Sequence, residues 1–255
     1  MENLSITPLG TVSPYSKGKK NCPGFLINHK DNKIVLDCGS GITRLLNFPD
    51  DLHDLSVIIS HLHKDHFSDL FSICYASHVY NNVGMLDEKV NIYLPSYPKD
   101  KYKYIKDFEE NGEHHCLFNS YSGSTDIYID GLRISFRENP HGILSHSIKL
   151  ESEAGTIVYS GDTGYKLNSL TKFAKGADLL ICESTFLKGQ KRTKDTHLYA
   201  SEAAKIAKKA KVRQLMLTHF WPEIKRKKYV EEAKEVFENT VAAKEGMKLT
   251  LQKKN

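Results

Sequence analysis

The sequence has no apolar run long enough to cross a membrane. Its first residues lack the basic segment and long apolar stretch of a signal peptide. No CxxC pair occurs, and the cysteines are odd in number and scattered, at Cys22, Cys38, Cys74, Cys116 and Cys182. That spacing does not suit a disulfide framework. We therefore expect reduced thiols in a cytoplasmic protein that does not contact membranes.

Internal repeats, low-complexity tracts and a convincing linker are also missing. The 255 residues would suit one large α/β domain or two small ones. A hydrophobic content of 40% and a charged content of 26% are typical of a globular protein. Without a linker to divide it, the chain is predicted to form a single domain over residues 1–255.

Acidic side chains are scarce toward the C-terminal end of the sequence. Residues 188–255 carry 18 basic and 8 acidic side chains, a net charge of +10, whereas the first 187 residues carry a net charge of −5. A basic C-terminal third fits a partner that carries phosphates. A solvated helical face is the alternative, and it would account for most of these lysines.

One short stretch is unusually rich in side chains that bind metals. Residues 55–59 form an apolar, β-branched run typical of a buried strand, and His61, His63, Asp65 and His66 follow it directly. Burying so many polar groups is costly without a counter-charge. Imidazole and carboxylate groups together suit zinc, manganese or iron. The stretch therefore predicts a metal site at the end of one strand.

The same pattern recurs along the chain, with a metal-capable residue directly after an apolar strand. It appears at Asp37, His141, Asp162, Glu183 and His219. Asp37 either forms a turn or accepts a hydrogen bond from a metal-bound histidine. Many strands broken by helices, without strict alternation, predict two mixed sheets packed together with helices outside.

Helix positions follow from apolar spacing and from turn-forming residues. Helices are expected over residues 42–47, from Phe67 onward, and over residues 98–110, 196–210 and 227–240. Asp130-Gly131 between two strands predicts a hairpin.

The combined motifs resemble those of the metallo-β-lactamase superfamily. They are His61-x-His63-x-Asp65-His66, His141, Ser160-Gly161-Asp162-Thr163 and Leu217-Thr218-His219-Phe220. Residues 37–41, 178–186 and 197–207 are similar to the ribonuclease Z-like phosphodiesterase branch. The resemblance implies a four-layer αβ/βα sandwich of two mixed β-sheets with helices on the outer faces.

The resemblance also implies a two-metal hydrolase. His61, His63 and His141 would hold one divalent cation, Asp65, His66 and His219 a second, and Asp162 would bridge them. Zinc is expected, with manganese or iron as alternatives. Such a pair generates a hydroxide at neutral pH, which Asp65 would also orient. His197, in the family's HST-like motif, would protonate the leaving oxygen, with its tautomer held by Glu183.

Three departures bear on the substrate. Ribonuclease Z carries a long tRNA-gripping arm between the residues that match His141 and Asp162, which here are only 21 positions apart. The HST-like motif has become His197-Leu198-Tyr199, and His146 stands where relatives often carry an aromatic residue. These changes favour a small or cyclic phosphodiester over RNA.

Several alternatives stay open. The chain could be a tRNA 3′-processing endoribonuclease that binds RNA through its basic C-terminal third, including residues 225–228. It could also hydrolyse a thioester, lactone or β-lactam on the same fold, or bind metal without turnover. A homodimer is the default expectation for its assembly.

Overall fold

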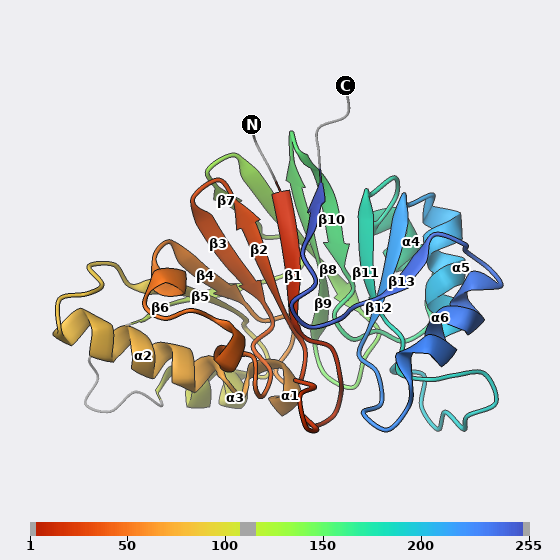
Figure 1. Ribbon diagram of the computed structural model, residues 1–255, viewed down its shortest axis with the longest axis horizontal. Helices are drawn as coiled ribbons and strands as arrows, with labels where there is room; N and C mark the ends of the chain where they lie inside the picture. The colour runs from red at the N-terminus through yellow and green to blue at the C-terminus, as the bar shows by residue number, and fades with distance from the viewer. Residues whose placement is uncertain (1–3, 108–115, 252–255) are drawn as a thin grey trace.

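The computed structural model of the chain describes residues 4–107 and 116–251, and within them the strands form two sheets (Figure 1). The first sheet is antiparallel at one side and parallel from β3 to β6. Its order is β14 (Leu249–Leu251), β1 (Leu4–Gly10), β2 (Gly24–His29), β3 (Asn32–Leu36), β4 (Leu55–Ile58), β5 (Val90–Pro95) and β6 (Cys116–Tyr121).

The second sheet repeats this plan. Its strands are antiparallel from β7 to β10 and parallel from β10 to β13. The order is β13 (Thr240–Ala242), β12 (Gln214–Thr218), β11 (Leu179–Glu183), β10 (Gly155–Tyr159), β9 (Ser145–Ser152), β8 (Leu132–Asn139) and β7 (Asp126–Ile129). As expected, Asp130 and Gly131, both with positive φ, form the turn of a hairpin between β7 and β8.

Helices cover the outer face of each sheet, while an apolar core fills the space between the sheets. On the first sheet lie α2 (Leu70–Asn82) and α3 (Lys99–Lys106); on the second lie α4 (Leu167–Phe173), α5 (Ala200–Ala210) and α6 (Arg226–Lys234) (Figure 1). The predicted four-layer αβ/βα sandwich is confirmed. Among the described residues, no helix has the length and apolar character needed to cross a membrane.

Several expected helices differ from those observed. Residues 42–47 contain only a 3-10 turn, η1 (Thr43–Leu45), because Pro49 follows too closely for a longer helix. A second such turn, η2, covers Asp50–Leu52. Helix α6 ends at Lys234, and β13 begins at Thr240. The helix expected to reach residue 110 ends at Lys106; residues 108–110 lie outside the described part of the chain.

Two further differences affect the site. The helix expected from Phe67 is preceded by a separate turn, α1 (Lys64–Phe67), so Asp65 and His66 are helical. Helix α5 begins only at Ala200, because the Glu202 carboxylate accepts a hydrogen bond from the Tyr199 backbone N–H (3.0 Å) and caps the helix there. His197 therefore lies in the extended segment before α5. Strands β6 and β13 and helix α4 were not predicted.

The parallel strands of both sheets end at one rim. Leu36 of β3 pairs with Ile58 of β4, and Glu183 of β11 pairs with Thr218 of β12. Residues just past these strands therefore face a common edge, where ligands commonly bind in such sheets.

Candidate metal centre

Four of the predicted ligands meet at the rim in a first group: His61, His63, His141 and Asp162. The Nδ1 atom of His63 lies 3.0 Å from His61 Nε2 and 3.1 Å from His141 Nε2. Asp162 Oδ2 lies 3.5 Å from His61 Nε2 and 3.8 Å from His141 Nε2. Three imidazoles and a carboxylate thus converge on one point.

A second group forms beside the first from Asp65, His66 and His219. The Nε2 atoms of His66 and His219 are 3.4 Å apart, and Asp65 Oδ2 lies 3.6 Å from the former and 3.8 Å from the latter. Asp162 contributes its other oxygen here, because Oδ1 lies 3.1 Å from His219 Nε2 and 3.5 Å from His66 Nε2.

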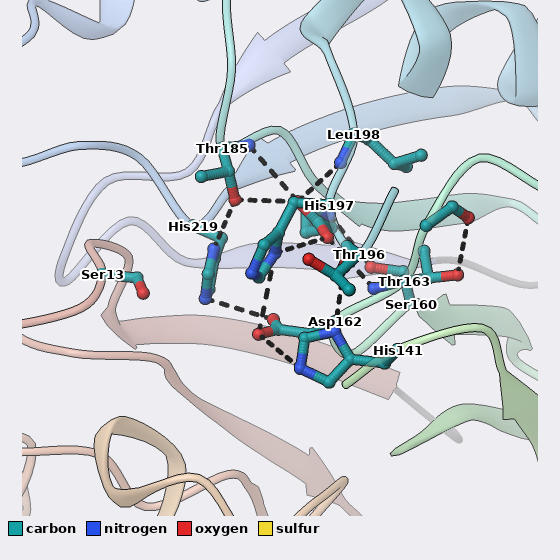
Figure 2. Close-up of polar contacts among 12 residues, drawn as sticks. Ser13, His141, Ser160, Asp162, Thr163, Thr185, Thr196, His197, Leu198 and His219 are labelled. Carbon is teal, nitrogen blue, oxygen red and sulfur yellow. Dashed lines mark hydrogen bonds and ion pairs between the residues drawn. The ribbon is translucent and has the colours of Figure 1, made fainter. Parts of the chain in front are cut away.

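Asp162 therefore stands between the two groups (Figure 2). Its Oδ1 atom is buried and makes no hydrogen bond with any described residue. Leaving a buried carboxylate oxygen without a partner is costly unless a cation satisfies it. One oxygen facing each group is the arrangement of a carboxylate that bridges two cations.

The outer nitrogens of four histidines are occupied by hydrogen-bond acceptors. The Nδ1–H groups of His61, His66, His141 and His219 donate to Ser60 Oγ (3.1 Å), Asp37 Oδ2 (2.7 Å), the Thr196 carbonyl (2.8 Å) and Thr185 Oγ1 (2.8 Å). We assign these tautomers from the partners, because a carboxylate or carbonyl can only accept. The four Nε2 lone pairs consequently point inward, as a metal requires. These residues fit a cation at each group.

Asp37 holds the first-sheet side of the centre. Besides the bond from His66, its carboxylate accepts hydrogen bonds from the Ser60 backbone N–H (2.6 Å), Ser60 Oγ (2.8 Å) and Tyr159 Oη (2.6 Å). Asp37 also orients His61 through Ser60, because Ser60 Oγ accepts a hydrogen bond from His61. Of the two roles that the sequence left open, Asp37 is the acceptor for a histidine of the cluster.

Glu183 does the same on the second-sheet side. It accepts hydrogen bonds from His197 Nδ1 (3.0 Å) and Thr185 Oγ1 (2.9 Å), and Thr185 in turn accepts from His219. The backbone N–H groups of Thr163 and Leu198 also donate to it, at 3.0 and 3.2 Å. Glu183 thus orients two histidines, one directly and one through a hydroxyl.

His197 reaches the solvent, with 23% of its side chain exposed. Its Nδ1 lies 3.9 Å from Asp162 Oδ2, beside the centre. Burial lowers the pKa of His197, but the Glu183 charge and hydrogen bond outweigh it and raise that pKa to about 9. Glu183 therefore favours the protonated form of His197.

The field at the centre favours positive charge. Burial lowers the pKa of His66, yet the charges of Asp162, Asp37 and Asp65 outweigh burial and hold this pKa well above its usual range. Asp65 itself accepts a hydrogen bond from Ser13 Oγ (2.7 Å), in the loop after β1. A cation would therefore be attracted to the second group.

The structure brings together every site residue that the sequence suggested. Sequence reasoning missed the hydroxyl groups that connect them, in Ser13, Ser60, Tyr159 and Thr185. Ser60 and Thr185 each lie within two residues of a strand end, which is the signal that could have found them. His146, expected near the substrate, is instead fully buried against the Tyr121 ring and is no guide to the substrate.

The fold and the residues at its rim are those of a metal-dependent hydrolase class, and comparisons with known proteins agree. A family model described as "Beta-lactamase superfamily domain" matches residues 32–220. The chain belongs to this superfamily.

Relatives cover nearly the whole chain. The probable metallo-hydrolase YhfI of Bacillus subtilis is 28% identical over 223 residues, which are 85% of this chain and 86% of the relative. A crystal structure of YhfI superposes with a TM-score of 0.88 at 24% identity, covering 98% of this chain and all of that one. A ribonuclease Z of Clostridium acetobutylicum is 28% identical over 296 residues, which cover 93% of this chain and 94% of the relative. A diphosphatase of the PhnP family shares the fold (TM-score 0.73, 14% identity, covering 96% and 97%).

Proposed function

We propose that this chain is a phosphodiesterase that works with two divalent cations, acting as one hydrolase unit over residues 1–255. The observation that carries the proposal is Asp162, whose two oxygens each face a separate group of ligands. A mononuclear site would need only one of these groups. The printed names of the relatives, a metallo-hydrolase and a ribonuclease Z, support the reaction class.

In this proposal His61, His63 and His141 hold one cation, and Asp65, His66 and His219 hold the other. Zinc fits the nitrogen-rich set, with manganese or iron as alternatives. When bound, such a pair supplies a nucleophilic hydroxide at neutral pH and neutralises charge on a phosphoryl group.

Two side chains of the chain itself handle the protons. Asp65, kept in place by Ser13, accepts the hydrogen bond that orients the attacking oxygen. His197 donates a proton to the leaving oxygen, since Glu183 keeps Nδ1 protonated and leaves Nε2–H free for the substrate. The same carboxylate stabilises the charged imidazolium before transfer.

The proposed substrate is a small phosphodiester. The positions between His141 and Asp162 are used by β9 and β10, which are integral to the second sheet, so no arm projects from them. Of the basic residues 225–228, two are paired with carboxylates: Arg226 with Glu245 (2.7 Å) and, at the surface, Lys227 with Glu231 (3.5 Å).

The test is hydrolysis of bis(p-nitrophenyl) phosphate by the metal-loaded protein, by Asp65→Ala and by the control Asp126→Ala, whose carboxylate pairs with surface Arg133 (3.0 Å). We expect Asp65→Ala to lose roughly 10²-fold or more in kcat, as for a general base, while the control stays active. Full activity of Asp65→Ala with its metal restored would refute the assigned mechanism.

A ribonuclease Z activity is the second candidate, favoured by the identity to the Clostridium acetobutylicum protein over most of both chains. Cleavage of a precursor tRNA across a salt series separates the two. An RNA enzyme should lose affinity steeply as salt rises, because phosphate contacts release counterions. A small-diester enzyme should not cleave the precursor at any salt concentration.

A further inference from the structure

A groove with a volume of about 580 Å³ lies between the end of β8 and helix α4. None of the ligands of the candidate centre lines it. Arg137 and Pro140 come from the β8 side, and Lys166 and Lys172 from α4 and the residue before it. The groove is therefore a separate feature on the outer face of the second sheet.

The groove carries an excess of positive charge. Arg137, Lys166 and Lys172 line it, against the single carboxylate of Glu138. Within the described residues, none of these three cations is paired with a carboxylate. Arg137 Nε donates only to Ser169 Oγ (3.4 Å), which leaves the outer guanidinium N–H groups for a ligand. Convergent Lys and Arg side chains in a concave surface suit a phosphate group.

The groove is connected to the centre through rigid backbone. Pro140 directly precedes His141, and its carbonyl accepts a hydrogen bond from the Gly164 N–H (2.6 Å). Asn139 Nδ2 donates to the Asp162 carbonyl (3.1 Å), and the Lys166 N–H donates to the Gly164 carbonyl (3.0 Å). The groove lining therefore reaches Pro140, one residue before the proposed ligand His141.

We propose that this groove binds a second phosphate of the substrate, away from the phosphodiester that is cleaved. The inference rests on the proposed function and narrows its substrate class to phosphodiesters that carry a further phosphate, as a 5′-phosphorylated oligonucleotide does. When one phosphate of a substrate is bound at the centre, the second phosphate is held near the groove at a high effective concentration. The affinity for the whole substrate is then higher than for either phosphate alone.

The test uses thymidine oligonucleotides of two to four residues, with and without a 5′-phosphate, on the metal-loaded full chain. The variant is Arg137→Gln/Lys172→Gln, and the control is Lys205→Gln, an exposed lysine of α5 outside the groove. For at least one length, the 5′-phosphate should lower KM roughly tenfold in the wild type and in the control, as expected for charge-assisted hydrogen bonds. In the double variant that preference should fall to near one.

Binding provides a readout that needs no turnover. Calorimetric Kd values for the thymidine 3′,5′-bisphosphate and for its two monophosphates, together with pTpT and TpT, should show the same loss of preference in the double variant. If no oligonucleotide length and no ligand pair depends on Arg137 and Lys172, the inference is overturned even when diesters are hydrolysed. If the preference is present but no diester is cleaved, the proposed function fails and the second phosphate site stands.

Discussion

Asp37 and Glu183 occupy corresponding places in the two sheets, and they hold the candidate centre from opposite sides. Each carboxylate accepts a hydrogen bond from one histidine directly and is linked to a second histidine through a hydroxyl group. The hydroxyl is that of Ser60 for Asp37 and that of Thr185 for Glu183. Both histidines served by Asp37 are fully buried, whereas His197 on Glu183 reaches solvent. In the proposed function, the Asp37 side would hold cations only, and the Glu183 side would also contact the substrate.

The largest effect should come from the residue that joins the halves. Asp162→Asn removes the charge that both ligand groups share, so we expect loss of at least one bound metal per chain and a fall in kcat of roughly 10³-fold, from several kcal/mol of lost electrostatic stabilisation. Metal analysis of the purified variant and bis(p-nitrophenyl) phosphate kinetics measure both. Full metal content with wild-type activity would show that the halves do not share a cation bridge.

His197→Ala tests whether the second half contacts the substrate. Removing the proton donor should lower kcat roughly 10²- to 10⁴-fold, while metal content stays at the wild-type level because all seven proposed ligands remain. A substrate whose leaving group needs no proton, such as a p-nitrophenyl ester, should be less affected than an alkyl diester. His53→Ala, an exposed histidine elsewhere, is the control. An equal loss on both substrates would contradict the proton-donor role.

The two halves differ in how much of them the sequence could predict. In the first half, His61 to His66 lie within one six-residue window shortly after β4, so a local pattern was enough. In the second half, His141, Asp162 and His219 meet only because β8, β10 and β12 end at the same rim. Local spacing cannot show that; the recurrence of metal-capable residues after apolar strands suggested a shared site, and the resemblance to a known family assigned the three residues to one centre.

The sequence predicted the overall fold and most of its strands, but not all of its elements or the hydrogen bonds at the site. Alternation and apolar runs gave most of the strands, but β6, with exposed Leu117 and half its residues at the surface, carries no clear alternation. The hydroxyls that orient the histidines were missed for another reason. A serine or threonine beside a strand end is common, and its partner is fixed by tertiary packing rather than by neighbours in the sequence.

Exchanging one carboxylate at a time sharpens the comparison between the halves. Asp37→Asn should weaken metal affinity roughly 10- to 100-fold, as losses of such supporting carboxylates do, because it orients two proposed ligands. The Glu183 carboxylate orients one proposed ligand and the proton donor. Compared with Asp37→Asn, Glu183→Gln should therefore lower metal affinity less and kcat more. Chelator competition and kinetics at saturating metal separate the two effects. If Asp37→Asn and Glu183→Gln changed metal affinity and kcat equally, the two carboxylates would not have the different roles proposed for them.

The smallest effect should come from a bond that supports Asp37 without touching the centre. Tyr159 is buried, packs against Phe25 with ring centroids 5.2 Å apart, and donates its hydroxyl to Asp37 Oδ2. Tyr159→Phe keeps the packing and removes one of four donors, so the free energy of unfolding should fall by about 1–2 kcal/mol. Urea unfolding at a fixed metal concentration measures it, because bound metal would otherwise shift the result. Tyr128→Phe, with 70% of its side chain exposed, should leave stability unchanged. If Tyr159→Phe lowered metal affinity as far as Asp37→Asn, the aspartate would depend on this single hydroxyl, and the three remaining donors could not keep its carboxylate in place.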